Sequence, residues 1–400
     1  MQKHQKNLKL LYYIEAFFSF SGSLIADMIT YYAESIGIFR GLIGMISGFI
    51  ELVSYTSEVI AGYLSDKFQQ RKIFLILSVT AWTLMWIPII QTTNHMLFLG
   101  LVLVQAFLGG SIVPVFDALT FSNSNPKNRV HVITNLDFIN QLFGFFGTLV
   151  AAGLAFYYKD VLLTNIEITR NLFILAACIQ FISLAFIVRI KESPVKSNSK
   201  NLFREANFIN KYFFQKNKRL RTFLLVNLLW AFATGIPLGF MSIYIINEMG
   251  ASMFFFFMTN AVMVISMLAS IKSWEAFAEK FGGKVTLFFS ALLTTIAIAG
   301  YLFHYEMIIF ANIILGIGWA GFNMTASVLF MNYLPKDDTA GFVGMFDLYM
   351  GVVFFIAPII GGILASQYDI RMIIIVSLIL RICVVPLFSF IQEEYKEVIT

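Results

Sequence analysis

Residues 62–72 read Gly-Tyr-Leu-Ser-Asp-Lys-Phe-Gln-Gln-Arg-Lys and lie between two long apolar runs. One run ends at Gly62, a short charged turn follows, and the next run begins at Ile73. Residues 277–284, Phe-Ala-Glu-Lys-Phe-Gly-Gly-Lys, repeat the pattern of residues 64–71, Leu-Ser-Asp-Lys-Phe-Gln-Gln-Arg, at an offset of 213 residues. This recurrence of a charged turn predicts a chain built from two related halves.

The composition indicates the class of protein. The chain has 400 residues, of which 58% are apolar and only 13% are charged, whereas a soluble domain carries about 25% charged residues. Several apolar runs without Lys or Arg reach the ~20 residues that a helix needs to cross a bilayer. The sequence therefore predicts an all-α polytopic membrane protein. The net charge of +5 comes from loops, so it does not indicate binding to nucleic acid.

Hydropathy predicts twelve membrane spans. They are 9–34, 41–64, 73–91, 96–121, 133–157, 170–190, 221–246, 252–273, 284–303, 306–333, 342–366 and 371–391. The polar stretch 191–220 separates six spans from six. We therefore predict an N-terminal six-helix bundle over 1–190, a cytoplasmic linker over 191–220 and a C-terminal six-helix bundle over 221–400.

The positions of the basic residues predict the orientation of the chain. If the N-terminus is cytoplasmic, the segments inside the cell hold 23 of the 28 Lys and Arg residues. Cytoplasmic loops carry such an excess of basic residues. We expect a multi-pass protein of the plasma membrane with both termini in the cytoplasm.

The charged turn also resembles a known motif. Its pattern Gly-x-Leu-x-Asp-Lys-x-x-x-Arg resembles the loop between the second and third helices of the major facilitator superfamily of transporters. The family has Gly at the place of Gln69 and usually a basic residue at the place of Gln70, and the second copy has Gly282. A further echo supports two halves, since residues 31–37 align with 244–250 at the same offset of 213. The resemblance implies two pseudo-symmetric six-helix bundles, transport by alternating access, no cofactor and a monomer.

The resemblance also implies a gate on the cytoplasmic side. It would pair Asp66 with the start of the eleventh span near Gly341, where a helix start attracts an anion. The residues that we predict to act in gating or at helix starts are Gly62, Asp66, Lys67, Arg71, Glu58, Asp137, Glu279, Lys280, Gly282 and Asp347. The alternative is that the charged residues of the loop are solvated and only set the topology.

Acidic residues inside predicted spans are candidates for coupling, because charges in a membrane are costly and usually functional or paired. The seven acids are Glu15, Asp27, Glu51, Glu58, Asp117, Asp137 and Asp347, and six of them lie in the first half. An apolar environment favours the protonated carboxyl, which suits proton coupling or a cationic solute. We select Asp27 and Glu51 as coupling or substrate carboxylates. The alternative is a buried acid that is hydrogen-bonded to a neighbouring helix. Glu15 is interpreted as interfacial, and Arg381 as a peripheral residue that snorkels or pairs within its half.

In the family that the sequence resembles, spans 1, 4, 7 and 10 line a central cavity. The implied solute-contacting residues are Tyr31, Gln105, Asp117, Asn227, Trp230, Trp319 and Asn323. Many relatives have Arg near the position of Gln105, so its absence disfavours an anionic substrate. Packing in the membrane is the alternative role for the two Trp residues.

Three classes of function remain open. The leading hypothesis is a proton-coupled secondary transporter, with efflux of a cationic or amphipathic solute favoured over uptake. The alternative is a proton-coupled or facilitated uptake permease for a sugar or other metabolite, and a more remote one is a transporter-like membrane sensor. An enzyme is not expected, because the four histidines form no spaced metal pair and no nucleophile motif is visible. No nucleotide-binding loop is present, so ATP-driven pumping by this chain is not expected either. The expected partners are a small-molecule substrate, protons and membrane lipid.

Overall fold

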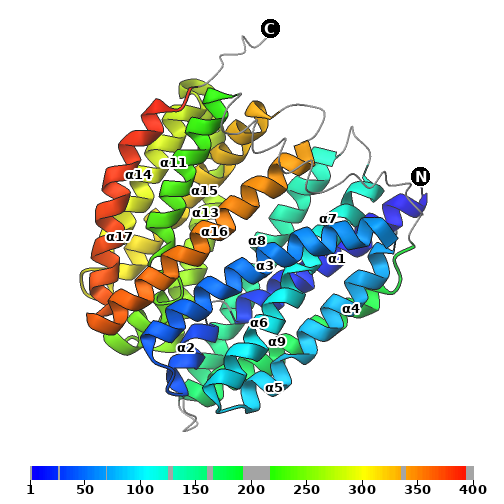
Figure 1. Ribbon diagram of the computed structural model, residues 1–400, viewed down its shortest axis with the longest axis horizontal. Coiled ribbons are helices and arrows are strands. Elements are labelled where there is room, and N and C mark those ends of the chain that lie inside the picture. Colours follow the sequence, from blue (N-terminus) through cyan, green and yellow to red (C-terminus); the bar gives the residue numbers. More distant parts are fainter. Residues whose placement is uncertain are drawn as a thin grey trace. The chain divides into compact units, whose positions relative to one another are not determined.

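The computed structural model describes residues 2–25, 28–68, 70–124, 129–159, 165–191, 217–334 and 339–392. All regular structure in these residues is helical, so the predicted all-α class is confirmed. The chain divides into two compact units, coloured along the sequence in Figure 1. One unit holds residues 1–200 and 239–261, and the other holds 201–238 and 262–400. Residues 239–261 thus group with the first unit, although our sequence-based division assigned them to the second bundle.

The helices of the N-terminal half are α1 (Gln2–Leu24), α2 (Met28–Ser35), α3 (Arg40–Phe68), α4 (Arg71–Leu84), α5 (Trp86–Gln91), α6 (His95–Gly110), α7 (Ile112–Asn123), α8 (Arg129–Lys159) and α9 (Asn165–Ile187). The helices that follow are α11 (Lys218–Gly235), α12 (Met241–Ile243), the π-helix η2 (Tyr244–Glu248), α13 (Met253–Phe281), α14 (Gly283–Gly300), α15 (Met307–Tyr333), α16 (Thr339–Gln367), α17 (Ile370–Val384) and the 3₁₀-helix η3 (Val385–Phe390).

Eleven helical stretches in the described residues are long and apolar enough to cross a membrane, and they match eleven of the twelve predicted spans. The seventh predicted span, 221–246, is helical but divided. Its helix α11 begins with three basic residues among its first four and ends at Gly235. The stretch continues as a turn, the short α12 and η2. Residues 221–246 are therefore apolar over a sufficient length, but no single helix runs through them.

The interruption after α11 follows from the sequence Gly-Ile-Pro-Leu-Gly at residues 235–239. Proline lacks the amide hydrogen that a helix interior needs, and glycine is a poor helix former. Gly239 has a φ of +84°, a conformation in which a side chain is strained. In the first span, α1 ends at Leu24 and α2 begins at Met28, and Ile25 is equivalent to Leu238 at the repeat offset of 213 residues.

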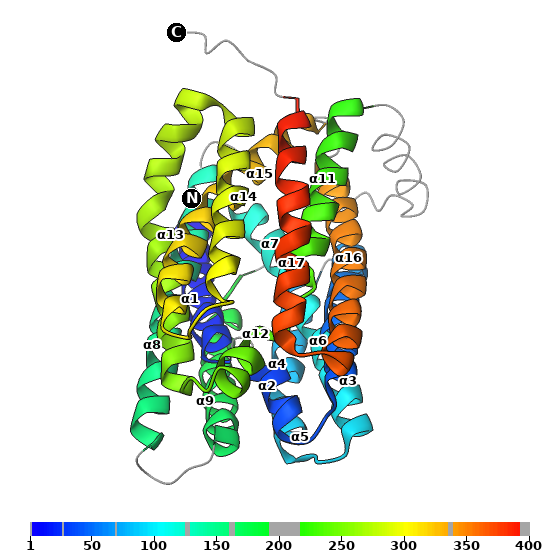
Figure 2. The same ribbon diagram turned by 90° about the vertical axis from the view of Figure 1, so that its left-hand side faces the viewer.

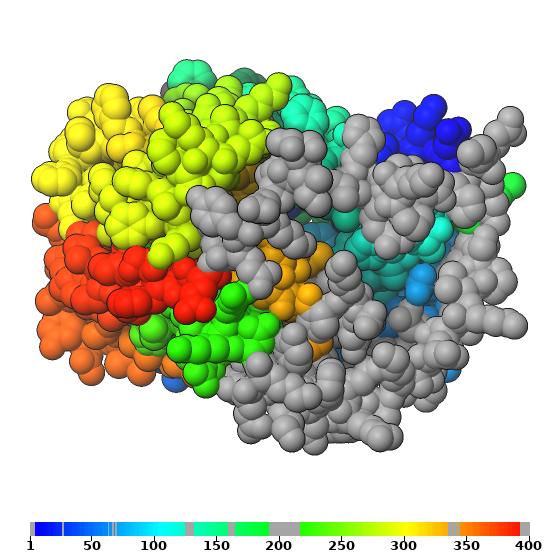
Figure 3. All heavy atoms as spheres, turned by 90° about the horizontal axis from the view of Figure 1, so that it is seen from above, coloured from blue at the N-terminus to red at the C-terminus, as the bar shows by residue number. Residues whose placement is uncertain are grey.

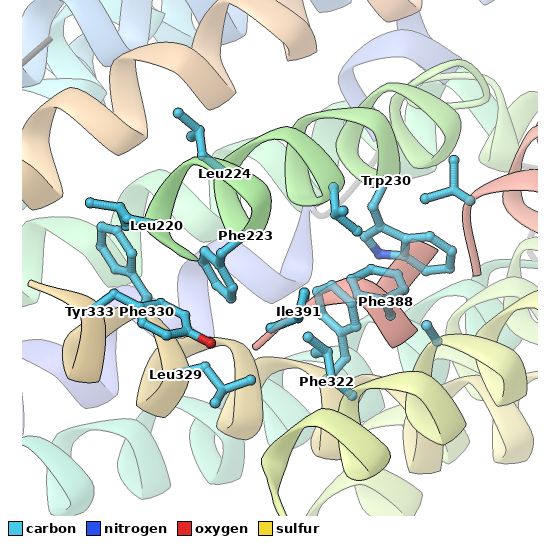
Figure 4. Close-up of a cluster of buried hydrophobic side chains, with 14 of the residues drawn as sticks. Leu220, Phe223, Leu224, Trp230, Phe322, Leu329, Phe330, Tyr333, Phe388 and Ile391 are labelled. Atoms are coloured by element: carbon cyan, nitrogen blue, oxygen red, sulfur yellow. The ribbon is translucent and has the colours of Figure 1, made fainter. Parts of the chain in front are cut away.

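Each unit has its own hydrophobic core. In the first unit, residues of α1, α4, α7 and α8 form a cluster that includes Leu11, Ile14 and Leu119. In the second unit, Phe223 and Trp230 of α11 pack with Phe322 of α15 and Phe388 of η3, as Figure 4 shows. The space-filling view in Figure 3 shows the red end of the chain, at η3, directly beside the green start of α11.

Glycines allow close helix packing within each unit. A Cβ atom on Gly110 of α6 would collide with the backbone of Ser54 in α3, and one on Gly316 of α15 would collide with the backbone of Met263 in α13. Small residues of this kind let helices in membranes approach closely, which increases van der Waals contact where lipid provides no hydrophobic driving force.

Candidate functional site

A group of four polar side chains joins the end of α2, the start of α3 and η2, all within the first unit. The Arg40 Nε atom lies 3.1 Å from the Glu34 Oε1 atom, and the Arg40 Nη1 atom lies 2.7 Å from Glu248 Oε1. Asn247 donates from Nδ2 to the second oxygen of Glu34 at 2.5 Å. We call Glu34, Arg40, Asn247 and Glu248 the outer-end cluster, because our predicted topology places it at the outer membrane surface.

The local backbone brings these side chains together. After α2 the chain turns at Gly37, which has a φ of +89°, and α3 begins at Arg40. Glu34 and Arg40 are therefore held on either side of a tight turn. Asn247 and Glu248 lie in η2, and π-helical turns occur frequently at functional sites. Glu34 and Asn247 are also equivalent residues of the two repeats, since they are 213 positions apart.

The segment that carries Asn247 packs closely on α2 and α3 below the cluster. Helix α12 contacts α2, and Figure 2 shows them beside each other. A Cβ atom on Gly239 would collide with the Ser47 hydroxyl of α3 and would lie 3.2 Å from the Thr30 methyl of α2. Ser47 and Thr30 are both buried. Residues 239–248 of the seventh span thus pack against α2 and α3. The outer-end cluster holds the end of this segment at Asn247 and Glu248.

A second polar group lies between α1 and α8. Asn140 donates from Nδ2 to Glu15 Oε1 at 2.7 Å, and the Ser19 hydroxyl donates to the same oxygen at 3.2 Å. Asp137 lies one helical turn before Asn140 on α8. Glu15 is therefore part of a polar group between two helices and is not merely interfacial.

Glu51 and Asp347 differ from Glu15 in their surroundings. Glu51 lies in the middle of α3 and Asp347 near the start of α16, and both are half-buried. Neither makes a hydrogen bond or ion pair within the part of the chain that the structure describes. A carboxylate in such a place is stable only if it is protonated, hydrated or opposite a cation.

The predicted gating residues are described only in part. The side chains of Asp66 and Lys67, and the side chains just before Gly341, lie outside the described residues. So does Asp27, the coupling candidate. Arg71 donates from Nη1 to the Ala118 carbonyl at 3.2 Å, and a Cβ atom on Gly62 would lie 3.5 Å from the Pro114 Cβ atom.

The equivalent turn in the second half is fully described. Glu279 and Lys280 are exposed at the end of α13, and the Lys280 Nζ atom lies 5.1 Å from the centroid of the Phe281 ring. Gly282 has a φ of +84°, so it supplies the tight connection to α14. Glu58 is half-buried and Asp137 is exposed. A role of any of these residues in gating stays a prediction.

The predicted solute-contacting residues fall into two groups. Tyr31, Gln105, Asn227 and Trp230 are buried within their units. Asn227 donates to the Phe223 carbonyl of its own helix at 2.9 Å, and Trp230 lies in the core of the second unit (Figure 4).

The other members are more accessible. Asp117 and Asn323 are exposed, and Trp319 is half-buried with its ring edge-on to Phe322. Contact of any of the seven residues with a solute stays a prediction, and burial favours a packing role for Asn227 and Trp230.

Sequence reasoning did not select any residue of the outer-end cluster as functional. Arg40 is only one of the few basic residues that the predicted topology leaves outside the cytoplasmic segments. The alignment of residues 31–37 with 244–250 nevertheless contained the necessary information, because it pairs Glu34 with Asn247. Equivalent residues of two repeats meet where a pseudo-two-fold axis passes between them, so such pairs are contact candidates.

Comparisons with known proteins agree with the fold. The sequence profile of the Major Facilitator Superfamily matches residues 11–274 and 273–398. The multi-drug resistance efflux pump PmrA of Streptococcus pneumoniae is 26% identical over 178 residues, which are 43% of this chain and 44% of the pump, so the match spans less than half of that relative. An uncharacterised MFS-type transporter of Methanocaldococcus jannaschii is 23% identical over 378 residues, covering 90% of this chain and 88% of that protein.

Solved structures support the same architecture. The crystal structure of a variant of the nucleoside transporter NupG superposes with a TM-score of 0.78 over 96% of this chain and 100% of that one, at 17% identity. At this identity the likeness concerns the fold. Together with the profile match over nearly the whole sequence, it shows that this multi-pass membrane protein is a transporter and that the chain belongs to the Major Facilitator Superfamily.

Proposed function

We propose that this transporter exports a small cationic or amphipathic organic solute by alternating access and that protons drive the export. The observation that carries the proposal is Glu51, a half-buried carboxyl group in the middle of α3 without a partner among the described residues. Its charge requires a proton or a cation inside the membrane. If Glu51 binds a proton and a cationic solute in turn, the movement of the proton is coupled to the movement of the solute.

The polar group of Glu15, Asp137 and Asn140 supports the same proposal. It adds two carboxyl groups to the first unit, and one of them is held in place by the Asn140 amide. The partial similarity to PmrA, which is named as a multi-drug resistance efflux pump, favours export. The similarity to NupG concerns the fold, so it does not favour nucleosides as the substrate.

The outer-end cluster suits a role in alternating access. Its bonds join Asn247 and Glu248 to Glu34 and Arg40 within the first unit, so they restrain the segment 239–248 against α2 and α3. Any step of the transport cycle that moves this segment then requires that these bonds break. Because the bonds are short and few, a solute or proton that changes the energy by a few kcal/mol is enough to shift the equilibrium.

A transport assay tests the proposal. The purified protein is reconstituted in liposomes that contain a pH-sensitive dye, a pH gradient is imposed, and cationic amphiphiles, nucleosides, sugars and organic acids are added in turn. We expect proton flux with cationic amphiphiles, and we expect its loss in Glu51→Gln. The matched control is Glu306→Gln, since Glu306 is exposed in the connection between α14 and α15 and lies outside the proposed machinery.

Two outcomes contradict the proposal. If cationic solutes move equally well without a gradient and in Glu51→Gln, coupling through Glu51 is wrong. If only nucleosides, sugars or organic acids elicit flux, the export of cations is wrong and the uptake alternative gains support.

A further inference from the structure

Arg381 of α17 is a charged side chain in the interior of the second unit. It lies within the last membrane span and is only 3% exposed. Its Nε atom donates to the Ser377 hydroxyl at 3.3 Å, and that hydroxyl donates to the Ala233 carbonyl of α11 at 2.6 Å. The guanidinium carbon lies 5.3 Å from the ring centroid of Trp230. The side chain is therefore enclosed by protein groups from α11 and α17.

Within the described residues, the charge of Arg381 lacks a counter-ion. No carboxylate there pairs with it, and its Nη1 atom has no hydrogen-bond partner. A buried guanidinium normally pairs with an acid, because an isolated charge in a medium of low dielectric is expensive. Its interaction with a Trp ring compensates only part of that cost.

The neighbouring Trp230 side chain also offers a donor without an acceptor. Its Nε1 atom is buried and lacks a partner within the described part of the chain. Arginine and tryptophan side chains can only donate. We call Trp230, Ser377 and Arg381 the donor cluster, and an acceptor that carries negative charge would satisfy its free donors.

We propose that the donor cluster binds a small monovalent inorganic anion, such as chloride, as the counter-ion of Arg381. A water molecule would satisfy one donor but would leave the charge uncompensated. One guanidinium matches one negative charge, and burial of Arg381 between α11 and α17 favours a compact ion over a large one. The site lies within the second unit and is separate from the carboxyl groups that we propose for proton coupling in the first unit.

Thermal unfolding of the purified full-length protein in detergent tests the proposal. Sodium chloride replaces sodium gluconate at constant ionic strength, because gluconate is too large for an enclosed site. A ligand that binds only the folded state raises the unfolding midpoint as its concentration exceeds the dissociation constant. We expect the midpoint to rise with the logarithm of the chloride concentration above that constant, and bromide to act in the same way.

Three variants identify the site. Arg381→Met removes the charge, so its midpoint should no longer depend on chloride and should match or exceed that of the unmodified protein in gluconate. Trp230→Phe keeps an aromatic ring beside the guanidinium and removes one donor, so the apparent chloride affinity should fall about tenfold. Arg371→Met is the matched control, because Arg371 is on the same helix but is exposed and bonds the Leu302 carbonyl.

The proposal is overturned if chloride and gluconate give equal midpoints at every concentration, or if Arg381→Met responds to chloride as the unmodified protein does. Should Arg381→Met fail to fold, Trp230→Phe decides, and an unchanged chloride affinity in that variant refutes the site. A response that also disappears in Arg371→Met would equally refute it, because a surface effect of chloride would then explain the data.

Discussion

Replacement of Arg40 by Met should release the outer end of the interrupted seventh span. Arg40 makes two charge-assisted hydrogen bonds, to Glu34 at 3.1 Å and to Glu248 at 2.7 Å. The Met side chain keeps much of the volume and removes the charge. The two carboxyl groups are then left on adjacent segments without a cation between them, so their attraction to Arg40 is replaced by mutual repulsion.

The magnitude follows from the number and exposure of these bonds. The side chains are 29% exposed for Arg40, 19% for Glu34 and 20% for Glu248, so solvent screens each pair in part. We assign about 1 kcal/mol to each pair, which is the upper end for exposed pairs and below the range for fully buried ones. Loss of both changes the free energy of the closed outer end by about 2 kcal/mol. An equilibrium constant changes tenfold for each ~1.36 kcal/mol, so the open population rises up to about 30-fold.

The reaction of one buried cysteine measures this change. Ser47 is buried directly under Gly239, so Ser47→Cys reports when the segment 239–248 moves away. In a background without Cys178 and Cys383, we expect a membrane-impermeant thiol reagent to label Cys at this position much faster after Arg40→Met.

The matched control is Arg170→Met. Arg170 donates to the Tyr32 hydroxyl at 3.0 Å within the first half and makes no bond to η2 among the described residues, so its loss should leave the labelling rate within about twofold. An unchanged rate in Arg40→Met refutes the reasoning, because the outer-end cluster would then not restrain the segment. Equal acceleration in both variants would show only a general loosening of the fold.

Three further substitutions test the packing. Gly239→Ala should destabilise the protein by about 2–3 kcal/mol in thermal unfolding, because strain at positive φ adds to a steric collision. The control Gly250→Ala, at a φ of +69° with no atom nearby, should show only the ~1 kcal/mol of strain. Equal losses in the two variants would refute the collision. Gly316→Ala should lose about 1–3 kcal/mol through overpacking, whereas Gly153→Ala has free space and should lose nothing measurable in the same assay. Asn7→Leu should lose about 2–3 kcal/mol, since the buried amide makes three hydrogen bonds that join α1 to Asn123 at the end of α7 and to the backbone of Lys191, four residues beyond α9. A loss below ~0.5 kcal/mol in denaturant titration would contradict that role.

The candidate site was predictable only in part. Acidic residues inside apolar runs are visible in any sequence, and Glu51 was selected on that basis. Glu15 was interpreted as interfacial, although it accepts hydrogen bonds from Asn140 and Ser19. Its role depends on which face of α8 meets α1, and that is a property of helix packing. The same holds for Arg40, whose two acidic partners lie six and 208 residues away along the chain.

The sequence by itself determined the class, eleven of the spans, the internal repeat and the family. These features depend on local composition and on spacing along the chain, because a helix needs a certain length to cross a bilayer and a repeated turn keeps its pattern. Hydropathy averages over about 20 residues, so it predicted one continuous span over 221–246. The Pro237 and Gly239 backbone divides that span into separate pieces.

Only the tertiary structure decided which polar groups meet. It joins Glu34 to Asn247 across 213 residues and leaves Arg381 without an acid in the described part of the second unit. The energy of a buried charge depends on the groups within a few ångströms of it, and those groups come from helices that are distant in sequence. Contacts between helices that are distant in sequence therefore fixed the outer-end cluster and the donor cluster, while local sequence fixed the helices that carry them.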